Sequence, residues 1–159
     1  MNPVLLTSGY CPHGQLVTQS SGMNRDWGCR LCALEKGILN AMLCGNGQGI
    51  IGLIKRGDVE RLLQLRDESS GITPLLACVV HADERAFGQL LGMGASLDAR
   101  DNNGNGLMHI AAKHNRLQFM INILFKQLDL SLEERNPLND ASPLRVAIEN
   151  ESKDVAAFL

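Results

Sequence analysis

The stretch from Gly94 to Phe125, GASLDARDNNGNGLMHIAAKHNRLQFMINILF, decides how the rest of the chain is interpreted. It begins with a turn rich in Asp, Asn and Gly, and two short apolar segments with helical spacing follow, separated by a polar break. Weaker copies lie on both sides, because Thr73 stands 33 residues before Gly106 and Ser142 stands 36 residues after it, each followed by Pro-Leu. A turn and two helices repeated at such a period indicate a solenoid, in which stacked units close the core together.

At these residues the chain resembles the ankyrin repeat family. The family motif Thr-Pro-Leu-His is incomplete, since Leu76 stands where the family has His, and Gly106 replaces the Thr that His109 would bond. The resemblance implies an all-α, ankyrin-like helical repeat solenoid of about four helix-turn-helix units over roughly residues 45–159. The segments that carry it are IIGLIKRGDVERLLQL (50–65), GITPLLACVV (71–80), LLGMGASLDARDNNG (90–104), DNNGNGLMHIAAKHN (101–115) and DASPLRVAIEN (140–150).

The predicted units differ in how regular they are. In the first, we expect an inner helix over 48–56 and an outer helix over 59–65, with Gly57-Asp58 as the break between them. Too few residues then remain before Gly71, so this unit is expected to have lost most of its hairpin. The chain ends inside the pattern of an outer helix, which we interpret as a fragment or an unusual C-terminal cap. The predicted boundaries of the units are 48–71, 72–104, 105–139 and 140–159, the last one incomplete.

Composition and charge narrow the functional classes. The 159 residues carry a net charge of −2 and contain 4% aromatic residues, so the chain has no global field for nucleic acid or a membrane surface. No apolar run approaches the roughly 20 residues of a membrane helix, and the first residues lack the basic and apolar regions of a secretory signal. Five unevenly spaced cysteines indicate a reducing compartment, and we expect an intracellular protein of the cytoplasm or nucleus.

Residues 1–32 stand outside the repeat and carry a metal-binding pattern. Two close pairs, Cys11-x-His13 and Cys29-x2-Cys32, are separated by a polar segment rich in turn-forming residues. Such a segment is too poor in apolar residues to fold alone, and zinc takes four thiolate and imidazole ligands in this arrangement. We therefore predict a structural Zn²⁺ held by Cys11, His13, Cys29 and Cys32, with ordinary thiols and a surface histidine as the alternative.

Several single residues can be assigned local roles. Residues 33–44 have the apolar spacing of a helix that ends at Gly45-Asn46-Gly47, and residues 33–47 are expected to connect the zinc module to the array as a cap. Cys44 is read as a buried or half-buried thiol and not as a fifth ligand. Asp58 is expected to cap the following helix and Pro74 to begin one. We expect core positions for Cys78, Met108 and His109.

We find no set of residues that indicates catalysis in this segment. The chain lacks a nucleophile with a base and an orienting partner, and it lacks a glycine loop of the phosphate-binding type. Any enzymatic activity is expected outside these residues. The expected function is instead that of a protein-protein interaction module, an adaptor, a scaffold or the substrate-recognition part of a larger protein.

The resemblance implies that a protein partner binds on the concave surface, at the hairpin tips and along the inner helices. The matching positions in the second, third and fourth units are Ser69, Ser70, Ile72, Val80 and His81, then Asn102, Asn103, Asn105, Lys113 and His114, then Asn139, Glu149 and Asn150.

Three alternatives remain open. The array could be the recognition arm of a ubiquitin-ligase-type enzyme, although a RING module needs eight ligands and this one offers four. It could belong to a bacterial effector that acts in the host cytoplasm, a class that often uses irregular ankyrin arrays. Residues 1–32 could also form a zinc knuckle for nucleic acid, but only Arg25 and Arg30 precede Cys32, so the attraction for phosphate would be weak.

Overall fold

The computed structural model describes residues 9–10, 16–17, 30–125 and 132–159. Within these ranges the chain is helical except for one short antiparallel pairing, β1 (Gly9–Tyr10) with β2 (Leu16–Val17). The all-α expectation is therefore confirmed for this part of the chain. The helices are α1 (Arg30–Leu43), α2 (Gly47–Ile54), α3 (Val59–Leu63), α4 (Pro74–His81), α5 (Glu84–Gly92), α6 (Leu107–Lys113), α7 (Leu117–Phe125), α8 (Pro143–Glu149) and α9 (Lys153–Phe158).

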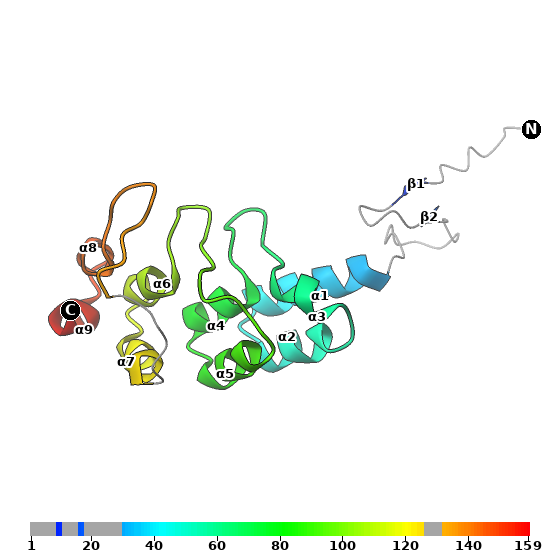
Figure 1. Ribbon diagram of the computed structural model, residues 1–159, viewed down its shortest axis with the longest axis horizontal. Coiled ribbons are helices and arrows are strands. Elements are labelled where there is room, and N and C mark those ends of the chain that lie inside the picture. The colour runs from blue at the N-terminus through cyan, green and yellow to red at the C-terminus, as the bar shows by residue number, and fades with distance from the viewer. Residues whose placement is uncertain (1–8, 11–15, 18–29, 126–131) are drawn as a thin grey trace, which may run out of the picture.

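Eight of these helices form four stacked pairs, α1–α2, α4–α5, α6–α7 and α8–α9. Helices α1, α4, α6 and α8 lie in one row, and α2, α5, α7 and α9 lie in a second row, with three loops rising from the first (Figure 1). Within the first row, α4 contacts both α1 and α6, and α6 also contacts α8. In the second row α2 contacts α5 and α7 contacts α9. We call the two rows the inner and the outer row.

The four inner helices end in the same way, which shows that they are equivalent. A residue in the left-handed conformation follows each helix, and its amide donates to the carbonyl three residues earlier. The next amide donates to the carbonyl five residues before it, so each end is a Schellman motif. The left-handed residues are Gly45, Ala82, Asn115 and Glu151, with φ of 68°, 58°, 52° and 55°.

This equivalence corrects the predicted first unit. The helix predicted over 48–56 as an inner helix is α2 of the outer row, and its inner partner is α1, which was predicted as a separate connecting cap. Asp58 does cap a helix, as predicted, because its side chain accepts from the amide of Arg61. That helix is the five-residue α3, an extra element on the way to the next hairpin. The local signals at Gly57-Asp58 and at Gly45-Asn46-Gly47 look alike, and only stacking identifies the second as the repeat break.

The hairpin of the first unit is also retained, so the prediction that it is mostly lost is wrong. Three turns are closed by one equivalent backbone bond: Asp67 N to Ile72 O at 3.0 Å, Asp101 N to Asn105 O at 3.0 Å, and Asn136 N to Ala141 O at 2.9 Å. The three loops rise side by side (Figure 1). The number of residues between the end of the inner helix and the turn is similar to that in the other units when it is counted from Gly45 and not from Gly57.

Side-chain caps explain where two of the four inner helices, α4 and α8, begin. The hydroxyls of Thr73 and Ser142 accept from Leu76 N and Arg145 N at 3.4 and 3.3 Å, and a proline occupies the first turn of both α4 and α8. Helix α6 begins at Gly106 without any side-chain cap. In the same helix, the Nδ1 atom of the fully buried His109 has no hydrogen-bond partner in the part of the chain that is described.

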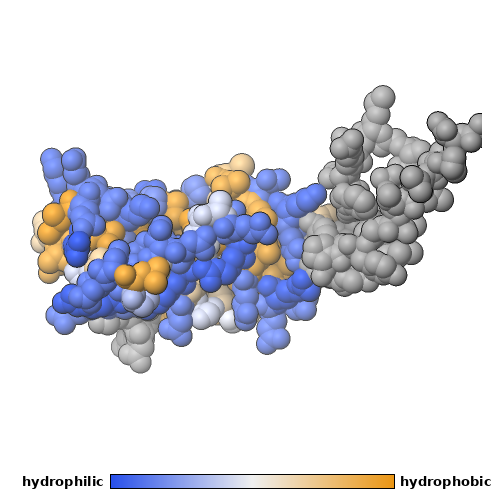
Figure 2. Space-filling model, turned by 90° about the horizontal axis from the view of Figure 1, so that it is seen from above, coloured by the Kyte–Doolittle hydropathy of each residue, from blue (hydrophilic) through white to orange (hydrophobic). Residues whose placement is uncertain are grey.

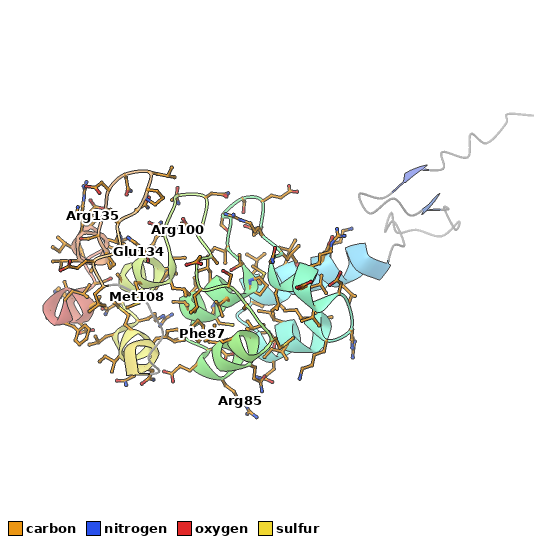
Figure 3. All side chains as sticks on the ribbon, in the orientation of Figure 1. Arg85, Phe87, Arg100, Met108, Glu134 and Arg135 are labelled. Atoms are coloured by element: carbon orange, nitrogen blue, oxygen red, sulfur yellow. The ribbon has the colours of Figure 1, made fainter. Side chains whose placement is uncertain are left out.

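The core runs between the two rows. Phe87 of α5 and Phe119 of α7 meet edge to face, with ring centroids 5.0 Å apart, and tie neighbouring outer helices together. Met108 and His109 are completely buried, as predicted, and His109 Nε2 donates to Ala141 O at 2.9 Å. Figure 3 shows Met108 and Phe87 inside the stack. Cys78 is buried as predicted, whereas Cys44 is exposed rather than buried or half-buried.

The end of the stack at α8 and α9 differs from its middle. Apolar surface gathers at this end when the molecule is seen from above (Figure 2). Its exposed large apolar residues are Leu138, Leu144, Ile148 and Phe158.

Candidate partner-binding surface

The hairpin tips hold each other in place by hydrogen bonds between units. Asn102 N donates to Ser70 O at 2.9 Å, and the side-chain amide of Asn102 donates to the carbonyls of Glu68 and Ser69. Within the first turn, Asp67 accepts from both serine hydroxyls and from Ser70 N. These bonds, led by those of the two hydroxyls, hold the pKa of Asp67 below its ordinary value. The tips therefore form a preorganised surface.

Not every predicted tip residue is available to a partner. Asn102, Asn103, Ser69 and Asn139 are exposed, and Ser70 and Ile72 are half-buried. Asn105 is 9% exposed, and its amide is used internally: Nδ2 donates to Asp101 Oδ2 at 3.0 Å, and Oδ1 accepts from Asn136 Nδ2 at 2.9 Å. The prediction that Asn105 contacts a partner does not fit this position, because its side chain joins two hairpins.

Asn136 was missed by the sequence analysis. It is 2% exposed and also donates to Asn103 O at 2.8 Å while its Oδ1 accepts from Leu138 N. An ion pair between Arg100 and Glu134 joins the same two hairpins, and the two side chains lie close together in Figure 3. Arg66 adds a bond to Arg100 O at 2.7 Å. These polar links join residues that are far apart in the sequence, so no local sequence pattern predicts them.

The other predicted contact residues stand at the last turns of the inner helices. His81, Lys113, His114, Glu149 and Asn150 are exposed and Val80 is half-buried. The equivalent residues of α1, counted back from Gly45, are Leu43 and Cys44, and both are exposed. They were missed because the first unit was read in the wrong register. We call these eight residues the inner-helix ridge: Leu43, Cys44, Val80, His81, Lys113, His114, Glu149 and Asn150.

Side chains of one unit donate hydrogen bonds to carbonyls at the end of the preceding inner helix. His81 Nε2 donates to Met42 O at 2.9 Å, and Arg116 donates through Nε and Nη2 to Val80 O at 3.1 and 2.8 Å. Ser152 Oγ donates to Lys113 O at 3.4 Å. The last carbonyls of a helix lack the usual helical partners, and although Met42 O also accepts from Gly45 N, these side-chain bonds join each inner helix end to the next unit.

Basic side chains are concentrated in the middle of the ridge. The pKa of His114 lies below its ordinary value because the ring is partly buried and because Lys113, Arg116 and His81 are close to it. No ion pair joins any of these four side chains to a carboxylate among the described residues. Four described arginines elsewhere form ion pairs: Arg61 with Glu35, Arg100 with Glu134, Arg135 with Asp140, and Arg145 with Glu149.

The predicted zinc ligands cannot be placed by this structure. Cys11, His13 and Cys29 lie outside the described residues, and only the backbone of Cys32, in the first turn of α1, is described. Within the described ranges no three histidine, cysteine or carboxylate side chains come together in a way that could hold a metal ion.

Three further observations concern a buried thiol, a groove and membranes. Burial, followed by the charge of Asp83, raises the pKa of the Cys78 thiol to about 12, which suppresses the reactive thiolate. A groove of about 480 Å³ between α1 and α2 includes Cys44, Gly49, Gly52 and Arg56 in its lining. None of the helices that the structure describes has the length and apolar character to cross a bilayer.

Comparisons with known proteins identify the fold and nothing more specific. No family model and no curated protein sequence matches the chain. Among solved structures, a chain in the crystal structure of the yeast ribosomal protein Rps3 in complex with its chaperone Yar1 is similar, with a TM-score of 0.64. The alignment covers 80% of this chain and 90% of that chain at 15% sequence identity. This likeness supports the stacked-helix architecture.

Proposed function

We propose that this chain is an ankyrin-like, non-catalytic module that binds a protein partner with its hairpin tips and inner-helix ridge. The ankyrin assignment is supported by the motif resemblance together with four helix pairs that share one helix ending and three turns that share one closing bond. The structural neighbour comes from a crystal structure of a protein complex, which favours the same class of function.

The observation that carries the proposal is that equivalent positions are exposed in every unit of the stack. Every inner helix presents its last turn at the same point of the unit, and Asn102, Asn103 and Asn139 extend the surface along the tips. A row of equivalent exposed side chains on a rigid array is the usual binding surface of solenoid proteins.

Photo-crosslinking at chosen positions tests this proposal. A photoreactive amino acid replaces Leu43, Lys113 or Asn103 on the proposed surface and, as a control, Arg85 or Gln89 of the outer row, all of them exposed. In cells that express the protein, one protein should crosslink from the first set and not from the second. That protein, once purified, should bind the wild-type chain in calorimetry. Equal crosslinking from the outer row would contradict the proposal.

We also propose, from the spacing of its four ligands alone, that residues 11–32 hold one structural zinc ion. Elemental analysis of the purified chain should find about one zinc per chain, and a strong chelator should lower the melting temperature because metal binding contributes folding free energy. Cys29→Ser should lose the metal and reproduce the shift, whereas Cys44→Ser should retain the metal. A metal-free chain that is insensitive to chelator would reject the site.

A further inference from the structure

The inner-helix ridge changes its chemistry in a fixed order along the stack. It presents Leu43 and Cys44 on α1, then Val80 and His81 on α4, then Lys113 and His114 on α6, and finally Glu149 and Asn150 on α8. The surface therefore passes from apolar through basic to acidic across four equivalent positions. Leu43 is 73% exposed, although leucine at a helix end gains nothing from contact with water.

The basic part of this order lacks its counter-charge within the described chain. His81, Lys113, His114 and Arg116 are close neighbours, and none forms an ion pair with a described carboxylate. The C-terminal carbonyls of α1 and α4 favour positive charge, but His81 and Arg116 already occupy two of them. Because the pKa of His114 is lowered, Lys113 carries the main exposed positive charge of the ridge, and a carboxylate from a partner would pair with its ammonium group.

The acidic end argues against a uniformly anionic ligand. Where the α6 unit has Lys113 and Asn115, the α8 unit has Glu149 and Glu151, both exposed. A nucleic-acid backbone or an anionic membrane laid along the ridge would meet the carboxylate of Glu151 and that of Glu149, which forms an exposed ion pair with Arg145, and like charges repel. A polypeptide can instead match the ridge position by position, because its side chains can change sign along its length.

We infer that the ridge binds an extended segment of a protein partner that presents, in order from α1 to α8, an apolar side chain, two acidic side chains and a basic side chain. This inference rests on the proposed function and specifies the partner that the surface selects. Packed helices lie about 10 Å apart and an extended chain advances about 3.3 Å per residue, so these side chains should be spaced by about three residues.

Selection from a library of random twelve-residue peptides tests the inference. The intact chain is immobilised and the bound peptides are sequenced, with the bare support as the reference. The enriched peptides should place acidic residues at two central positions, an apolar residue on one side and a basic residue on the other. Their affinity should fall as salt is added, because exposed ion pairs are screened.

A charge exchange on the ridge makes the test specific. The double variant Lys113→Glu with Glu149→Lys keeps the net charge and reverses the order of the signs. It should bind the selected peptide about tenfold more weakly, and a peptide with its acidic and basic residues exchanged should regain the loss. The matched control is Glu84→Arg with Arg85→Glu on α5, an exchange between exposed residues that should leave the affinity unchanged. Arg85 projects from the outer row (Figure 3).

Three results would overturn the inference. These are enriched peptides without acidic central residues, no enrichment over the bare support, or an exchange variant that binds as the wild type does. Circular dichroism melting of both variants verifies that each is folded. None of these results touches the proposed function itself, because crosslinking from Leu43 or Asn103 to a partner of other chemistry would still support protein binding.

Discussion

Helices α4 and α8 occupy the same place in their units, and yet their apolar side chains have different surroundings. Leu75 and Val79 of α4 are 1% and 0% exposed. Leu144 and Ile148 stand at the equivalent positions of α8 and are 37% and 63% exposed. Helix α4 lies between α1 and α6, whereas within the described residues α8 has an inner neighbour only on the α6 side. In a solenoid, therefore, the same sequence pattern has a different energetic value in the middle and at the end.

The largest expected effect is a difference in reactivity between the thiol in the middle of the stack and the thiol in the first helix pair. Cys78 should react with iodoacetamide at least about a thousandfold more slowly than exposed Cys44, because a pKa raised from 9.0 to about 12 leaves little thiolate and burial blocks access. Peptide mapping by mass spectrometry gives the two rates. In denaturant the rates should converge. Comparable labelling of the two thiols in the folded chain would show that Cys78 is not held in the core.

Truncating two equivalent leucines shows, as a change in the free energy of unfolding, how differently the middle and the end of the stack are packed. Leu75→Ala should lower the free energy of unfolding by about 2–5 kcal/mol, because a buried leucine leaves a cavity. Leu144→Ala should cost less than about 1 kcal/mol, because much of that side chain is already in water. Urea unfolding followed by circular dichroism gives both values. Equal losses would mean that α8 is covered as fully as α4.

A smaller difference in stability is expected between removing an asparagine that links two hairpins and removing an asparagine that does not. Asn136→Ala should cost about 2 kcal/mol, because it removes three hydrogen bonds of a buried side chain and leaves Asn105 Oδ1 without that donor. Asn139→Ala removes one bond, which Ala141 N donates to an otherwise exposed side chain, and should cost about 0.5 kcal/mol. Thermal melting of the pair ranks them, and a reversed order would reject the role given to Asn136.

The smallest effect concerns the missing cap of α6, and it should stabilise the protein. Gly106→Thr should add about 0.5–1 kcal/mol, because its hydroxyl can accept from the first turn of α6, as Thr73 does in α4. A side chain there would meet only the flexible ends of Glu134 and Arg100, at 3.2 Å or more. Gly106→Ala supplies the carbon without the hydroxyl. If both variants shift the melting temperature equally, the cap is not the cause.

The errors of the sequence analysis share one physical origin. Gly57-Asp58 carries all the local signals of a repeat break, including a working helix cap at Asp58, and so does Gly45-Asn46-Gly47. Nothing local distinguishes the two. The packing of α1 against α4 and of α2 against α5 decides between them, and it also moves Leu43 and Cys44 onto the ridge.

The sequence by itself determined the helical repeat, the starts of α2, α3 and α4 to within about one residue, and the burial of Cys78, Met108 and His109. These follow from apolar periodicity, capping residues and the position of proline, which act within a few residues of chain. Only the tertiary structure decided which helices pair, that Asn105 and Asn136 join the hairpins, and that Leu144 and Ile148 are exposed. These features depend on contacts between residues about 30 or more apart in the chain, and such contacts follow from stacking rather than from local preference.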